Sequence, residues 1–313
     1  MTEQVSMRIA YGQALADYGE INPDVVVLDA DVSASTQTHY FAARFPERFF
    51  NVGVAEAGMV DVAVGFALGG KIPFANTFAS LISLRAAEQV RTCVAYARTN
   101  VKLAAAYSGL SDSKDGPTHH SVIDIAVMRA MPNLAVVVAA DATEARKLVP
   151  AVAEYDGPVY LRLSRAVVPV VFGDDHEVEI GKGNVLHDGT DVTVMATGVM
   201  VSRALLAAER LGQEGVEARV VSLHTIKPLD RELILASVER TGAVVTVEEH
   251  SMIGGLGGAV AELLGEMLPV PVVRVGIRDT FTDTGPYEAL LDHYGMSVAD
   301  IVSAAHRAIG MKK

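Results

Sequence analysis

Continuous apolar runs alternate along the first half of the chain with stretches in which apolar residues recur every three to four positions. The runs predict buried parallel strands, and the periodic stretches predict helices that cover the sheet. The expected strands are residues 24–28, 72–74, 101–107, 134–139 and 159–163, and the expected helices are residues 7–18, 56–68, 84–98, 122–131 and 142–154. This alternation predicts an open, mostly parallel α/β sheet.

The alternation is interrupted once, between residues 169 and 190, and then starts again. The interruption contains the turn-forming sequences VVFGDD, GKGN and HDGTD, which are typical of a connection between domains. Beyond it lie expected strands at 192–196, 218–222, 244–248 and 272–275, and helices at 201–211, 231–238 and 255–265, before two C-terminal helices. We therefore expect two doubly wound α/β domains, residues 1–168 and 191–313, with a linker at 169–190.

Composition narrows the class of protein. The 313 residues carry a net charge of −12, which argues against a broad nucleic-acid-binding surface. No apolar run approaches the ~18 residues of a membrane-spanning helix, and the N-terminus lacks the pattern of a signal peptide. Cys93 is the single cysteine, which excludes an intramolecular disulfide framework. We expect a cytoplasmic protein that binds neither nucleic acid nor membranes, and its hydrophobic composition indicates tightly packed sheets, large subunit interfaces, or both.

The strongest local signal is the sequence DGPTHH, Asp115 to His120, in the loop after the strand at 101–107. In doubly wound sheets, ligands bind beyond the carboxyl ends of the strands. A carboxylate and two imidazoles within six residues are suited to proton transfer to and from a hydroxylated or carbonyl substrate. The alternative is a surface turn that happens to contain histidines.

Glu56 is the second candidate, because it lies in the small-residue, apolar sequence NVGVAEAGM at the start of an expected helix. In dry surroundings a carboxyl group resists ionisation and can act as a proton donor near neutral pH. The alternative is an acid at a helix N-terminus, where the macrodipole favours it. The glycine-rich sequence MIGGLGGAV lacks the spacing of a dinucleotide fingerprint, so close helix packing or a contact between subunits explains it better.

Four motifs in one order resemble thiamine-diphosphate-dependent transketolases. They are GVAEAGM, ANTFAS, KDGPTHH and LSR, and the later sequences HTIKPLD, EEHSMIGGLGGAV and DTFTDTG resemble the C-terminal domain of that family. The resemblance covers essentially the whole chain and corresponds to the C-terminal half of a transketolase: a pyrimidine-binding domain and then a transketolase C-terminal domain. The later motifs are shared with deoxyxylulose-phosphate synthases and with β subunits of 2-oxo-acid dehydrogenases.

The resemblance implies three residues that bind thiamine diphosphate. Glu56 matches the catalytic glutamate that hydrogen-bonds the aminopyrimidine ring and favours its imino tautomer. Phe78 matches the aromatic residue that stacks on the pyrimidine, and Asp31 matches an acid near the thiazolium. Leu81 and Leu84 stand where the family commonly has further aromatic residues, so the pyrimidine pocket is less aromatic here.

The resemblance also implies a sugar-phosphate site. His119, as a catalytic residue, and Asp115 match the pair that contacts hydroxyl groups of the donor substrate. Arg8, Ser35 and Arg165 match residues that hold the phosphate. Two positions depart from the family pattern: Tyr107 replaces a phosphate-contacting histidine, and Lys114 replaces an acid.

The diphosphate half of the cofactor site is missing from the sequence. The family holds Mg²⁺ and the diphosphate with a GDG motif and a downstream Asn, because Mg²⁺ requires such oxygen ligands, and no GDG occurs here. We therefore expect no metal ligands in this chain, and a partner subunit that contains GDG, holds Mg²⁺ and assembles with this chain as α₂β₂. The expected function is transfer of a two-carbon ketol unit between sugar phosphates. The alternatives are a 2-oxo-acid dehydrogenase β subunit, a deoxyxylulose-phosphate-synthase-like carboligase, or an inactive structural or regulatory paralogue.

Overall fold

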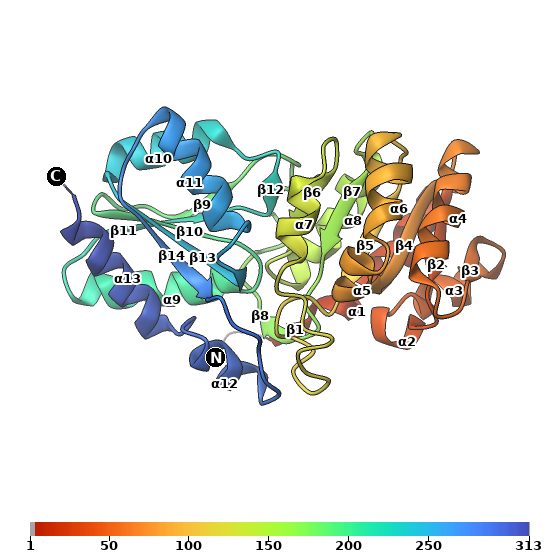
Figure 1. Cartoon of the computed structure of the whole chain (residues 1–313), viewed down its shortest axis with the longest axis horizontal. Coiled ribbons are helices and arrows are strands. Elements are labelled where there is room, and N and C mark those ends of the chain that lie inside the picture. The colour runs from red at the N-terminus through yellow and green to blue at the C-terminus, as the bar shows by residue number, and fades with distance from the viewer. Residues whose placement is uncertain (1–3, 313) are drawn as a thin grey trace.

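The computed structural model describes residues 4–312 and contains two α/β units side by side (Figure 1). The first unit is built on a seven-stranded sheet. From edge to edge its strands are β12 (Thr225–Lys227), β6 (Ala135–Val138), β7 (Val159–Arg162), β5 (Lys102–Ala106), β4 (Ile72–Phe78), β2 (Val25–Asp29) and β3 (Phe49–Asn51). Every pairing is parallel except that of β12 with β6.

Helices cover both faces of this sheet because its central strands are apolar on both sides. In β2, Val25 and Val27 join one core and Val26 and Leu28 join the other. The first core is covered by α1 (Met7–Ile21), α3 (His39–Arg44) and α8 (Ala142–Glu154). The second is covered by α4 (Glu56–Leu68), α5 (Ala79–Leu84), α6 (Ala87–Gln89), η2 (Val90–Tyr96) and α7 (Asp124–Ala130). The short elements α2 (Ser33–Thr36) and η1 (Pro46–Arg48) lie in the connection from β2 to β3.

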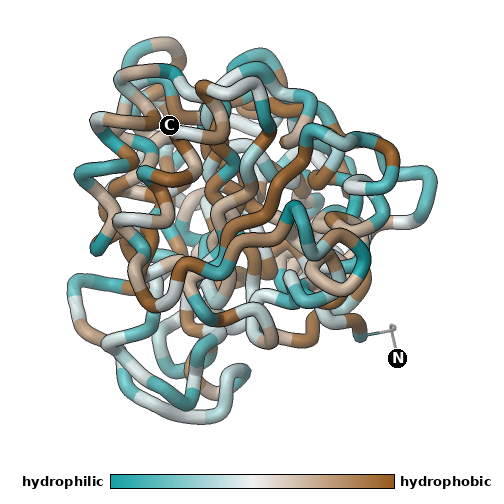
Figure 2. The backbone as a smooth tube through the Cα atoms, turned by 90° about the vertical axis from the view of Figure 1, so that its right-hand side faces the viewer, coloured by the Kyte–Doolittle hydropathy of each residue, from teal (hydrophilic) through white to brown (hydrophobic). Residues whose placement is uncertain are grey.

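The second unit has a five-stranded sheet of the same kind. Its order is β14 (Val272–Ile277), β13 (Val244–Ser251), β10 (Val192–Ala196), β11 (Ala218–Ser222) and β9 (Asn184–His187), with only β9 antiparallel among the described strands. Its helices are α9 (Met200–Gln213), α10 (Arg231–Thr241), α11 (Leu256–Met267), α12 (Tyr287–His293) and α13 (Val298–Gly310). A separate antiparallel pair joins β1 (Gln4–Ser6) to β8 (Val167–Pro169). Figure 2 shows hydrophobic stretches through the interior and polar turns at the periphery.

These two units confirm the predicted fold class of open, mostly parallel α/β sheets. The helices expected at residues 56–68 and 142–154 have the predicted bounds. The single helix expected over 84–98 is wrong: α5 starts directly after β4, because the small, buried Ala79, Ser80 and Ser83 fit against the neighbouring strands, and the chain breaks again before η2.

Two strands that the sequence pattern does not predict bear on how the units are joined. β12 follows a strand of the second unit but pairs with β6 of the first, so the second unit completes the first sheet. β9 lies inside the stretch 169–190, which the turn-rich sequence predicts as a linker, and it pairs with β11. Both strands are three or four residues long, too short to show a clear alternation.

The glycine-rich sequence before α11 is occupied by a side chain of the chain itself. The buried Glu248 carboxylate accepts hydrogen bonds from the amides of Leu256 and Gly257 at 2.7 and 2.8 Å. A Cβ on Gly255 would overlap this carboxylate. The sequence therefore serves close packing at a helix N-terminus, as predicted, since an anion there satisfies free amides.

Candidate active site

The residues predicted to form the site follow neighbouring strands at the carboxyl edge of the seven-stranded sheet. Strands β3, β2, β4, β5 and β7 are adjacent and parallel, so the segments after them meet at one edge, where ligands bind in such folds. The residues and their strands are Glu56 after β3, Asp31 and Ser35 after β2, Phe78 at the end of β4, Asp115 and His119 after β5, and Arg165 after β7. Arg8 joins them from the first turn of α1.

Two arginines converge on one aromatic ring at this edge. The Cζ atoms of Arg8 and Arg165 lie 5.0 and 4.8 Å from the ring centroid of Tyr107. Arg8 also donates to the Tyr107 hydroxyl at 3.0 Å and to the backbone carbonyl of Ser35 at 2.6 Å. Arg165 forms an ion pair of 2.6 Å with the buried Asp112. We call Arg8, Ser35, Tyr107, Asp112 and Arg165 the Tyr107 cluster.

The Tyr107 cluster is electrostatically suited to bind an anion. Partial burial lowers the pKa of Arg8, and the nearby charge of Arg165 lowers it further, although Tyr107 and Asp112 oppose this. An anion between the two guanidinium groups would relieve their repulsion. Among the described residues, the buried Nε of Arg8 has no hydrogen-bond partner, so it can donate to such a ligand.

Phe78 connects the Tyr107 cluster to the histidine loop. Its ring stacks on that of Tyr107, with centroids 4.4 Å apart and an interplanar angle of 27°. The His119 ring meets Phe78 edge-on at 6.2 Å. The residue predicted to stack on the cofactor and the histidine predicted to contact the substrate are therefore neighbours.

The loop at residues 108–121 presents Asp115 and His119 outward while it buries Asp112. Burial raises the pKa of the Asp112 carboxyl, and Asp115 adds to the rise, whereas the Arg165 guanidinium opposes it. Asp112 orients Arg165, so it belongs to the site although the sequence analysis does not select it. Its signal in the sequence is weak: it is one acid in a polar loop, three residues before Asp115.

Glu56 is the first residue of α4, and its side chain is only 5% exposed. Its two carboxylate oxygens lie 3.2 and 3.5 Å from Nη1 of Arg85, a residue whose side chain is 58% exposed. The burial expected from the small-residue sequence is present, and Arg85 in addition gives the carboxylate a charged partner. Because Arg85 is at the surface, its side chain has room to leave when another group approaches Glu56.

Asp31 adopts a positive φ of 64° in the turn after β2 and accepts a hydrogen bond of 2.8 Å from Asn51. The buried Asp29 holds this turn through the amide of Val32 and the hydroxyls of Thr36 and Thr38. Burial raises the pKa of Asp29, although these hydrogen bonds oppose the rise. Within residues 4–312, no hydrogen bond joins Asp31 or Glu56 to the Tyr107 cluster.

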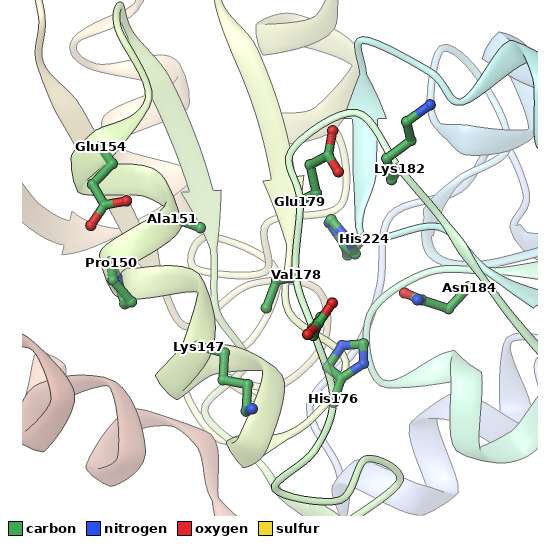
Figure 3. A pocket seen from close by; sticks show the side chains of 11 residues that line it. Lys147, Pro150, Ala151, Glu154, His176, Val178, Glu179, Lys182, Asn184 and His224 are labelled. Atoms are coloured by element: carbon green, nitrogen blue, oxygen red, sulfur yellow. The ribbon is translucent and has the colours of Figure 1, made fainter.

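A pocket of about 700 Å³ lies away from this edge and includes none of the predicted site residues (Figure 3). It lies between the C-terminal half of α8, the segment 176–184 and His224. The described residues contain no group of three His, Cys, Asp or Glu side chains arranged to hold a metal ion. None of their helices is long and apolar enough to cross a membrane.

The chain matches two family models in sequence. Residues 3–170 match the transketolase pyrimidine binding domain, and residues 181–301 match the transketolase C-terminal domain. The chain is 42% identical over 310 residues to the 6-deoxy-6-sulfo-D-fructose transketolase subunit SqwH of Clostridium sp. (strain MSTE9), which covers 99% of this chain and 96% of that protein. It is 38% identical over 302 residues to one of the subunits of the apulose-4-phosphate transketolase of Phocaeicola vulgatus, which covers 96% of each.

A solved structure has the same fold over its full length. It is a split gene transketolase, described as an inactive beta4 tetramer. The two chains are 49% identical and superimpose with a TM-score of 0.93, over 99% of this chain and all of the other.

Proposed function

The chain belongs to the transketolase family, of which it forms the C-terminal half, and from this premise we propose that it transfers a two-carbon ketol unit between sugar phosphates with thiamine diphosphate. The observation that carries the proposal is the Tyr107 cluster, where two arginines face a ring that Phe78 stacks on. This arrangement puts an anion site beside the residue proposed to bind the cofactor.

The residues at the sheet edge fit the pyrimidine half of the cofactor. When bound, thiamine diphosphate supplies a carbon nucleophile that accepts the two-carbon unit. Glu56 would hold the aminopyrimidine ring nitrogen from a dry position and exchange a proton with it, which requires Arg85 to move aside. The half-exposed face of Phe78 would stack on the pyrimidine, and Asp31 would lie near the thiazolium.

The donor sugar would bind between the Tyr107 cluster and the loop at 108–121. Arg8 and Arg165 would hold its phosphate, with the turn that carries Ser35 fixing Arg8. Asp115 and His119 would contact its hydroxyl groups. The Nδ1 atom of His119 lies 3.0 Å from the Thr118 hydroxyl, which leaves Nε2 to exchange a proton with the substrate.

A separate chain would supply the diphosphate half of the site. The sequence contains no GDG motif, so the partner would hold Mg²⁺ and the diphosphate in an α₂β₂ assembly. Exposed apolar residues support such a contact, since they lie on and beside the helix that begins at Glu56. These residues, which we call the α4 face, are Val54, Val62, Leu68, Leu84 and Tyr96.

Further parts of the proposal concern boundaries and location. Residues 1–168 would form the pyrimidine-binding domain and residues 191–313 the C-terminal domain, with a linker at 169–190. The single cysteine suits a cytoplasmic enzyme of carbohydrate metabolism.

The test of substrate class uses the chain together with a GDG-containing partner, thiamine diphosphate and Mg²⁺. Ketose phosphates and 2-oxo acids are offered as donors in parallel assays. We expect turnover with ketose phosphates, because the two arginines match a phosphate and Asp115 and His119 match hydroxyl groups. Turnover with 2-oxo acids alone would favour the 2-oxo-acid dehydrogenase alternative, and no turnover with either would favour an inactive paralogue.

A further inference from the structure

The second unit holds the loop at 108–121 through a histidine next to His119. The His120 side chain is buried, with Nδ1 2.7 Å from the Thr282 hydroxyl and Nε2 3.1 Å from the Asp112 carbonyl. A carbonyl only accepts, so Nε2 carries the proton. Burial lowers the pKa of His120 and keeps the ring neutral, so Nδ1 accepts from Thr282.

The start of the loop is held by Glu249 of β13. This buried carboxylate accepts from the amide of Leu110 at 2.7 Å. It fits only because the preceding residue is Gly109, where φ is +62° and a Cβ would overlap the carboxylate. Arg162 donates to the backbone carbonyls of both Glu249 and Ser121, and Ser121 exchanges two backbone hydrogen bonds of 3.0 Å with Gly109. Both ends of the loop are thus tied to β13.

A third contact holds the middle of the loop. The amide of Gly285 donates to the Ser113 carbonyl at 3.1 Å, and the Thr284 methyl group lies against Gly116, which has a φ of +81°. The second unit therefore contacts the loop at its beginning, middle and end, although it contributes none of the predicted site residues.

We infer that Thr282 and Glu249 are positioning residues, through which the second unit fixes the loop that carries Asp115 and His119. The inference deepens the proposed function and rests on it for the role of the loop. A reacting group that shifts by about 1 Å loses a large part of its rate contribution. The second unit thus controls donor binding without touching the donor.

The first experiment measures hydrogen exchange in the full chain without cofactor or partner. In Thr282→Val the hydroxyl is lost while the shape is kept. We expect the amides of His119 and His120, which both bond to the Gly116 carbonyl, to exchange on the order of tenfold faster. Thr282→Ser, which keeps the hydroxyl, should restore the wild-type rate. Thr280→Val is the matched control, because the exposed Thr280 hydroxyl bonds only to the neighbouring Phe281 carbonyl among the described residues.

The second experiment measures donor kinetics in the assembled enzyme. We expect Thr282→Val to raise KM for the donor on the order of tenfold, with recovery in Thr282→Ser and no change in thiamine diphosphate affinity. Unchanged exchange in Thr282→Val would overturn the inference, whatever the enzyme does. Faster exchange with unchanged donor KM would overturn the positioning role. If the wild-type assembly has no ketol-transfer activity, the proposed function fails, while the exchange result still decides whether the loop is held.

Discussion

At the scale of single residues, the site combines buried acids with arginines that face a ligand. Glu56 and Asp112 are both buried carboxylates, and each has one arginine partner. The two pairs differ in the partner: Arg165 also lies over Tyr107, whereas Arg85 extends into solvent. Asp112 therefore serves to fix an arginine, while Glu56 has a partner that a cofactor can displace.

Glu56→Gln tests the catalytic role of this carboxyl group. The amide keeps the shape and can still hydrogen-bond, but it cannot exchange a proton. We expect ketol transfer by the assembled enzyme to fall on the order of 10³-fold, which corresponds to about 4 kcal/mol of transition-state stabilisation.

Steady-state kinetics and the melting temperature of Glu56→Gln give the readout. An unchanged melting temperature assigns the loss to chemistry and not to folding. Activity within a few-fold of wild type would contradict the assignment of Glu56.

The sequence predicts the residues of the site better than their contacts. Seven of the eight predicted residues follow strands at one sheet edge, because carboxylates and imidazoles after apolar runs are visible in the sequence. Asp112 and Asn51 are missed, since nothing local distinguishes them from other loop polar residues. The pairing of Glu56 with Arg85 depends on the break between α5 and α6, which propensity alone does not reveal.

At the scale of elements, α4 has two functions. Its N-terminus presents Glu56, and its buried side packs Met59, Val60 and Ala63 on the sheet. Its outer side carries exposed apolar residues, and it packs beside η2, which adds Tyr96 to the α4 face. A helix that is apolar on both sides suits burial between two chains.

Val62→Asp tests whether the α4 face binds the partner subunit. A buried, unpaired charge is costly at an interface, so we expect the dissociation constant of the complex to rise at least about tenfold. Leu206→Asp on α9 is the matched control, since Val62 and Leu206 are both helical and are 44% and 50% exposed. Analytical ultracentrifugation with the partner measures both variants, and equal effects of the two changes would argue against a specific interface on α4.

At the scale of the whole molecule, the two units are joined by buried polar groups as well as by apolar packing. β12 extends the first sheet, and the first core continues from α1 and α8 into α9 and α13. Glu249 adds a carboxylate at the junction, next to Arg162 and Tyr287. The sequence predicts two α/β units but not these links, because they pair segments more than 85 residues apart.

Glu249 makes the stability of this junction depend on pH. Burial raises its pKa from 4.5 to about 7. Below about pH 4.5 the group is protonated in both the folded and the unfolded chain. Between that pH and about 7 the unfolded chain loses the proton first, so the folded state loses stability as the pH rises, by on the order of 3 kcal/mol.

Urea denaturation of the wild type and of Glu249→Gln between pH 5 and 8 measures this contribution. Gln cannot ionise and retains an acceptor for Leu110. We expect the free energy of unfolding of the wild type, relative to the variant, to decrease as the pH rises to about 7 and then to level off. A difference that is constant across this range would contradict the assigned titration.

The central claim is that this chain provides one half of a thiamine diphosphate site and that a second chain provides the other. The most direct test measures ketol transfer from a ketose phosphate with thiamine diphosphate and Mg²⁺, using the chain alone, the GDG-containing partner alone, and the two mixed in increasing ratio. We predict no activity from either chain alone and activity that saturates at equal amounts of the two. Full activity of this chain by itself would contradict the claim.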